Sequence, residues 1–175
     1  MHFFLYFFGG VILDLLKKNV QVIAPIDGKV IDLSEVDDRV FSQRLAGDGV
    51  AIVSTGDTVV APVGGKISFM FTTNHAFVIT AANGIQVLVH IGTDTLNLHG
   101  EGFKNLKEMG DAVKPGDEII KLDRNFIEGK GCCLVVPVLI IKPDEIEFLQ
   151  MNIGDLVKAG QQTIMRYKLV KNKEF

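Results

Sequence analysis

Two histidines flank a predicted β-hairpin turn, and their chemistry is the first indication of function. His75 and His90 lie in apolar runs on either side of Asn83-Gly84, a dipeptide typical of type I′ turns. With this turn, Phe77 lies opposite His90. Because side chains alternate along a strand, His75 shares a face with Phe77. The two histidines then become diagonal neighbours, about 7–8 Å apart by Cα, and could flank one small group.

Two neighbouring imidazoles allow two kinds of chemistry. One ring could attack phosphorus and carry a phosphoryl group while the other donates a hydrogen bond to its oxygens. Alternatively, both rings could bind zinc, with Asp94 after His90 as a third ligand. The sequence has no G-x-x-x-x-G-K-[ST] loop and no dinucleotide fingerprint, and no Ser-His-Asp arrangement is identified. The residues by themselves leave both chemistries open.

The elements that position the histidines are predicted to be short β-strands. From Val20 onward, apolar runs rich in β-branched and aromatic residues are separated at short intervals by Gly, Pro and Asn. This pattern predicts an all-β fold, an antiparallel sandwich or barrel. Helix is expected only in short segments, at 37–44, 103–109 and 125–130.

Two sequence motifs each occur twice. APIDGKV at 24–30 returns as APVGGKI at 61–67, and GDAVKPG at 110–116 returns as GDLVKAG at 154–160. A repeated strand-turn-strand unit can bury its apolar face against its own copy, which predicts an internally duplicated sandwich. The same motifs also mark lipoyl and biotinyl carrier domains. Such a carrier needs a lysine at a hairpin tip, where this chain has its Asn-Gly turn, so the repeats indicate fold and not function.

The composition indicates one domain without a surface for nucleic acid. The 175 residues are 47% hydrophobic, which is enough for one substantial core. The net charge of -3 leaves no basic stripe to neutralise a phosphate backbone, so nucleic acid is not expected as a partner. Cys132 and Cys133 are adjacent, and adjacent cysteines rarely reach the geometry of a disulfide. Free thiols fit a reducing compartment.

Residues 1–19 form an apolar extension ahead of a domain predicted to span 20–175. The apolar run at 2–13 is shorter than the roughly 20 residues that a membrane-spanning helix needs. A basic pair follows this run, whereas a signal peptide carries its basic residues in front. Three interpretations stay open: residues 1–18 make weak contact with a membrane surface, dock on the domain or on a second copy, or form a poorly ordered extension.

Several motifs, in order and at matching spacing, resemble one known family. They are APIDG at 24–28, GDGVAI at 47–52, TNHAF at 73–77, VHIGTDT at 89–95 and GEGF at 100–103. This set is similar to the glucose-type IIA domain of the bacterial phosphoenolpyruvate:sugar phosphotransferase system. The similarity covers nearly all of the chain after the extension.

The resemblance implies a phosphoryl carrier with a β-sandwich fold. It implies a phosphohistidine at His90, formed from the histidine-phosphorylated carrier HPr and passed to the cysteine of a sugar-specific IIB domain. His75 would hydrogen-bond the phosphoryl group, and Thr73 would orient His75. A backbone carbonyl should hold one nitrogen of His90 protonated, which leaves the other free to attack. No cofactor is required, and the protein would be cytoplasmic, with membrane association only through a permease or the N-terminus.

The same resemblance implies a rim that binds partners. Its members are Asp38, Val40, Phe41, Phe71 and Asp94. Carboxylates beside a phosphoryl group would repel it, so Asp38 and Asp94 are better suited to pairing with a basic partner during encounter. Val40, Phe41 and Phe71 would be exposed and would form an apolar contact zone.

Two alternatives remain. The run at 89–94 is similar to the histidine-glycine-aspartate run of zinc-dependent cell-wall peptidases of related fold, although no His-x-His ligand pair is found. The other alternative is a regulatory protein whose phosphorylation is sensed by partners, a role that could coexist with transport. In that case His75 and His90 could bind zinc if a partner supplied a further carboxylate.

Overall fold

The computed structural model describes residues 19–170. Within this range, no helix is both long enough and apolar enough to cross a bilayer. The predicted membrane contact of residues 1–18 lies outside the described residues and stays a prediction. The domain boundary near residue 20 is likewise untested.

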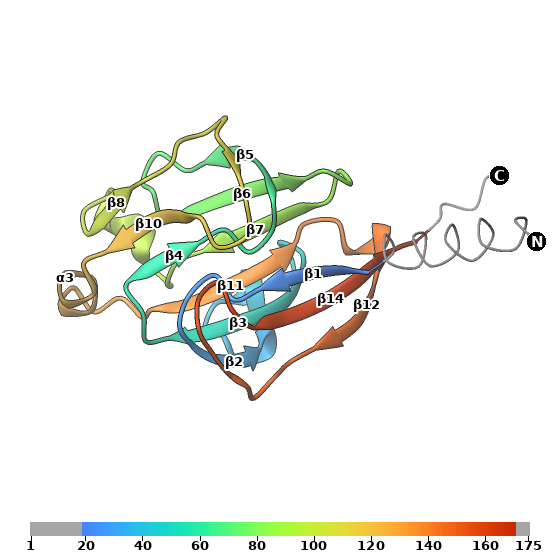
Figure 1. The fold of residues 1–175 in the computed structure, drawn as a ribbon. Helices are drawn as coiled ribbons and strands as arrows, with labels where there is room; N and C mark the ends of the chain where they lie inside the picture. Colours follow the sequence, from blue (N-terminus) through green and yellow to red (C-terminus); the bar gives the residue numbers. More distant parts are fainter. Residues whose placement is uncertain (1–18, 171–175) are drawn as a thin grey trace, which may run out of the picture.

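Three antiparallel sheets build the described part of the chain (Figure 1). An eight-stranded sheet has the order β13 (Leu156–Val157), β2 (Gly28–Asp32), β3 (Asp48–Ser54), β11 (Val135–Ile140), β7 (Gln86–His90), β6 (Ala76–Ala81), β5 (Gly65–Met70) and β9 (Ala112–Val113). The two three-stranded sheets are β1 (Val20–Ile23), β14 (Thr163–Leu169) and β12 (Ile146–Met151), and β4 (Thr58–Val60), β10 (Glu118–Leu122) and β8 (Phe103–Asn105). The strands pair antiparallel throughout, which confirms the predicted all-β sandwich.

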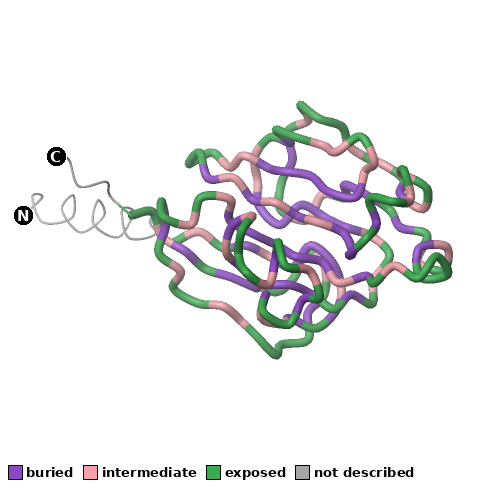
Figure 2. The backbone as a smooth tube through the Cα atoms, turned by 180° about the vertical axis from the view of Figure 1, so that it is seen from behind, coloured by how far each residue is buried: buried purple, intermediate pink, exposed green. Residues whose placement is uncertain are grey.

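The three sheets share one hydrophobic core. Fully buried side chains from each sheet meet in it, among them Phe77 of β6, Ile120 of β10 and Tyr167 of β14. Figure 2 shows buried residues concentrated on the strands and exposed residues in the connecting loops. Because strands from distant parts of the sequence line this core, the described residues pack as one unit.

A second, smaller apolar cluster covers the outer face of the eight-stranded sheet. Leu33 of η1 (Leu33–Glu35) and Phe41 of α2 (Arg39–Ser42) are buried there. They pack with Ala51 of β3 and Leu139 of β11, and Leu88 of β7 lies beside them. This cluster marks the face on which His90, two residues after Leu88, also lies.

The predicted helices are confirmed in two of three places. The segment 37–44 contains α2, and 125–130 overlaps α3 (Arg124–Gly129). The helix predicted at 103–109 is wrong, because this segment opens with strand β8. Phe103 is buried and Lys104 is exposed, the alternation of a half-buried strand, and β10 supplies the pairing partner. Two further 3-10 turns, η2 (Thr95–Leu98) and η3 (Pro143–Glu145), complete the short helices.

The internal duplication predicted from the repeats is visible in equivalent hydrogen bonds. Each Ala-Pro repeat pairs with one Gly-Asp repeat, since β2 pairs with β13 and β5 pairs with β9. The amide of Gly160 donates to the carbonyl of Ala24 at 2.8 Å, and the amide of Gly116 donates to the carbonyl of Ala61 at 2.9 Å. The two units therefore repeat one backbone arrangement around the shared core.

The predicted register of the β6–β7 hairpin is wrong by one residue. His90 pairs with Ala76, and Phe77 pairs with Val89. A type I′ turn needs positive φ at both central residues, but only Gly84 has it (φ 86), and Asn83 does not. The loop instead spans three residues and ends in the left-handed glycine, with the amide of Gly84 donating to Ala81. This extra residue shifts the pairing by one position.

Candidate functional site

The loop between β5 and β6 carries two of the predicted site residues, Thr73 and His75. The amide of Phe71 donates to the carbonyl of Ala76 at 3.0 Å, which closes the loop, and the amide of Asn74 donates back to Phe71 at 2.8 Å. His75 therefore lies just outside β6. By strand alternation with the observed register, it would face away from His90, so its actual position comes from the loop and not from the strand.

The structure brings the two imidazoles together. The ring centroids of His75 and His90 are 4.9 Å apart, and the ring planes meet at 75°. His90 ends β7 and is partly accessible, whereas His75 is only 3% exposed. The two rings thus share one site on the outer face of the larger sheet, where β7 ends.

A backbone carbonyl determines which nitrogen of His90 carries the proton. The Nδ1 atom lies 2.9 Å from the carbonyl oxygen of Gly92. A carbonyl only accepts hydrogen bonds, so Nδ1 must donate, and the lone pair is left on Nε2. Gly92 has φ 79, and a Cβ there would lie 2.5 Å from Cγ2 of Thr95 and 2.8 Å from the carbonyl oxygen of Cys133. Only glycine fits this turn, which aims the carbonyl at the ring.

The partner of His75 is a hydroxyl, which sets a different condition. Oγ1 of Thr73 lies 2.5 Å from Nδ1 of His75. A hydroxyl can donate or accept, so either tautomer of His75 is compatible with this contact. When the hydroxyl donates, Nε2 of His75 carries a hydrogen that can be donated onward. The two histidines therefore differ in their tautomers: the carbonyl of Gly92 fixes that of His90, whereas the hydroxyl of Thr73 permits either tautomer of His75.

Both histidines are neutral at pH 7. The pKa of His90 is lowered to about 4, chiefly by burial and next by the charge that a protonated His75 would carry. The hydrogen bond to Gly92 and the charge of Asp38 act in the opposite direction. Burial also lowers the pKa of His75. A neutral ring at His90 has the free electron pair that nucleophilic attack requires.

Aromatic rings enclose the pair from both sides. The ring centroid of Phe41 lies 4.9 Å from that of His90, and the centroid of Phe71 lies 5.1 Å from that of His75. Phe69, which is not among the predicted rim residues, packs edge-on against Phe71, with ring centroids 4.8 Å apart. The spacing of two residues between Phe69 and Phe71 was the available signal.

The expectation that the apolar rim is exposed is correct for one side chain and wrong for another. Val40 is 45% exposed, and Phe71 is half-buried. Phe41 is 4% exposed, because α2 turns it inward onto the outer apolar cluster. Phe41 therefore packs against the ring of His90 and offers little surface to a partner. Val40, Phe71 and Phe69, which is 47% exposed, remain accessible.

The two predicted rim carboxylates differ in how they are held. Oδ1 of Asp38 accepts a hydrogen bond from the amide of Val40 at 2.7 Å and so caps α2. The negative charge of Asp38 weakly opposes the lowering of the His90 pKa. Asp94 is exposed and left-handed (φ 61), and it makes no capping bond to η2.

Within residues 19–170, no group of three or more His, Cys, Asp and Glu side chains is arranged to hold a metal ion. The two histidines and Asp94 therefore do not form the three-ligand zinc set that their spacing suggested.

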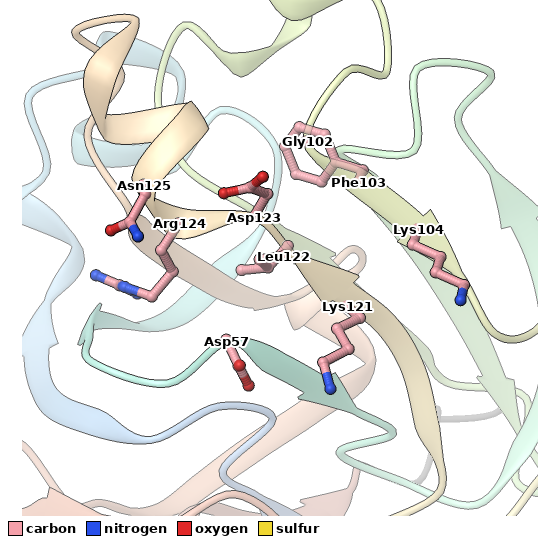
Figure 3. Close-up of a pocket in the computed structure, with 9 residues that line it drawn as sticks. All are labelled: Asp57, Gly102, Phe103, Lys104, Lys121, Leu122, Asp123, Arg124 and Asn125. Carbon is pink, nitrogen blue, oxygen red and sulfur yellow. The ribbon is translucent and has the colours of Figure 1, made fainter.

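A separate open hollow lies between β4, β8, β10 and α3. It has a volume of about 660 Å³, and its charged lining includes Asp57, Lys104, Lys121 and Arg124 (Figure 3). The guanidinium of Arg124 is already committed to the carbonyls of Ser54 and Gly56. None of the residues that line this hollow belongs to the histidine site.

The fold and the site define a class of protein, a duplicated β-sandwich that carries a pair of imidazoles. Comparison with known proteins agrees with this class. Residues 20–146 match the family described as phosphoenolpyruvate-dependent sugar phosphotransferase system, EIIA 1. The chain belongs to this family and is thus a component of the sugar phosphotransferase system.

Relatives and a solved structure support this assignment. A protein of Borreliella burgdorferi called PTS system glucose-specific EIIA component is 40% identical over 146 residues, covering 82% of this chain and 77% of that protein. A protein of Haemophilus influenzae with the same name is 38% identical over 150 residues, covering 86% and 90%. The structure titled glucose permease IIA from Mycoplasma capricolum matches with a TM-score of 0.81 and 34% identity, covering 86% of this chain and 97% of that one. The zinc peptidase alternative finds no support in these comparisons.

Proposed function

We propose that this protein carries a phosphoryl group on Nε2 of His90, between phosphorylated HPr and the cysteine of a IIB domain. The hydrogen bond between Nδ1 of His90 and Gly92 carries the proposal, because it leaves the lone pair on Nε2. The residues by themselves offer two histidines and no reason to choose between them, and this bond supports the choice of His90. The names of the relatives favour a glucose-type system.

Beyond phosphorylated HPr and the IIB cysteine, the transfer needs no other reactant. The lone pair on Nε2 of His90 attacks the phosphorus held by the HPr histidine, a nitrogen–phosphorus bond forms, and the donor's own nitrogen–phosphorus bond breaks with its electrons returning to the donor ring. In the second half, the thiolate of the IIB cysteine attacks the same phosphorus and His90 leaves as a neutral ring. Its low pKa favours this departure without prior protonation.

His75 assists as a hydrogen-bond donor. With the hydroxyl of Thr73 donating to Nδ1, Nε2 of His75 carries a hydrogen that can bond to the phosphoryl oxygens. The exposed side chains of Val40 and Phe69, with the half-buried Phe71, supply an apolar contact zone, and Asp38 and Asp94 attract a basic partner. The carrier works in the cytoplasm and requires no metal.

The decisive experiment is phosphorylation with phosphoenolpyruvate, enzyme I and HPr. An acid-labile, base-stable adduct should form on the unaltered protein and disappear in His90→Ala, while His75→Gln should still be phosphorylated but transfer slowly to IIB. Phosphorus NMR should place the group on Nε2. An adduct that persists in His90→Ala, or a phosphoryl group on Nδ1, would refute the proposal.

A further inference from the structure

The loop that holds Thr73 and His75 turns at a residue in an unfavourable conformation. Asn74, between them, has φ 56. Residues other than glycine rarely adopt this left-handed backbone conformation, although asparagine tolerates it when its side-chain amide is hydrogen-bonded. Such a conformation persists where neighbouring groups hold it. Whatever holds Asn74 therefore also sets the directions in which Thr73 and His75 leave the backbone.

One side chain from another sheet provides that hold. Nδ2 of Asn105 donates to Oδ1 of Asn74 at 2.8 Å, in a partly buried contact. Asn105 ends β8, where it pairs with Ile120 of β10, so its own backbone is fixed by the small sheet. The loop at 71–75 connects two strands of the larger sheet, β5 and β6. The contact thus links the loop to a rigid strand far along the sequence.

The Asn105 amide has no competing bond. Its Oδ1 atom is buried and has no hydrogen-bond partner among the described residues. A buried amide that forgoes a bond at one end loses free energy, so this position is not optimised for stability alone. The bond to Asn74 is the interaction that orients the amide.

We propose that Asn105 is a positioning residue for phosphoryl transfer. By holding Asn74 in the left-handed region, Asn105 keeps Thr73 against Nδ1 of His75 and His75 beside His90. Asn105 touches neither ring and acts only through the loop. This inference rests on the proposed phosphoryl-carrier function, although the placement of His75 can be measured without it.

Asn105→Ala removes the donor and should leave His90 phosphorylated by HPr, since the Gly92 hydrogen bond is untouched. Transfer from His90 to IIB should slow about 5- to 30-fold, the fold-change that corresponds to ~1–2 kcal/mol of lost support for a left-handed residue. The nitrogen and carbon NMR shifts of the His75 ring should move, while those of His90 should still show a protonated Nδ1. Lys104→Ala, an exposed neighbour on β8, is the matched control and should change neither readout.

Rescue separates positioning from general damage. Glycine adopts positive φ without help, so adding Asn74→Gly to Asn105→Ala should restore transfer to within about twofold. Asn105→Leu, which keeps the volume of the side chain, should behave like Asn105→Ala and serves if the alanine variant does not fold. Normal transfer with unchanged His75 shifts in both variants would overturn the inference, and so would a slow variant that the glycine does not rescue. If the unaltered protein takes up no phosphoryl group, the proposed function fails, while the His75 shifts still decide whether Asn105 positions that ring.

Discussion

Acidification should destabilise the protein through His90. The pKa of this ring is about 4 in the folded protein, chiefly because of burial, and near 6.5 in an unfolded chain. A proton therefore binds the unfolded state first as the pH falls. The free energy of unfolding contributed by neutral His90 is fully present above pH 6.5 and is lost progressively as the pH falls toward 4.

The size of this effect follows from the two pKa values. At pH 7 both states are mostly neutral, and the difference is negligible. At pH 5 the unfolded histidine is almost fully protonated while the folded one is mostly neutral, which costs ~2 kcal/mol of stability. Carboxylates and His75 add their own dependence, so the measurement must isolate His90.

Urea unfolding of the unaltered protein and of His90→Gln at pH 7 and pH 5 provides that isolation. The unaltered protein should lose ~2 kcal/mol more than the variant between the two pH values, because only the unaltered protein contains His90, while both contain His75. An NMR titration of the ring should give a midpoint near 4. Equal losses in both proteins, or a His90 midpoint near 6.5, would refute the claim that burial keeps this ring neutral.

Four further outcomes are expected. Gly92→Ala forces a Cβ against a side chain and a carbonyl at positive φ, so urea unfolding should show a loss of at least ~2 kcal/mol and NMR a changed tautomer at His90. Thr73→Val should leave phosphorylation by HPr intact and slow phosphoryl transfer to IIB about 3- to 10-fold, measured as the rate of transfer in a quenched time course. Asp38→Asn keeps the cap on α2, so stability should stay within ~0.5 kcal/mol while the association rate with HPr loses part of its salt dependence. Deleting residues 1–18 should reduce co-sedimentation with liposomes if this segment is an anchor, and equal binding by both forms would dismiss that idea.

The histidine pair shows how a correct expectation can rest on an incorrect step. The Asn-Gly signal placed His75 and His90 together through a type I′ register, and the rings are indeed adjacent. The observed register is shifted by one residue, and strand alternation alone would now separate them. The bend at Asn74 brings His75 back. At the hairpin turn, Asn83 is compatible both with a type I′ turn and with the observed three-residue loop. Its presence in the sequence could therefore not reveal which of the two the surrounding sheet would select.

The sequence by itself determined the features that depend on residue type and local spacing. The short β-branched runs specified an antiparallel all-β fold, the repeats specified its duplication, and the ordered motifs around His90 indicated the family. Only the tertiary structure decided features that join distant segments. It turned Phe41 inward onto Leu139 and linked Asn105 to Asn74. Both contacts join segments far apart in sequence, and such contacts leave no local pattern from which they could be read.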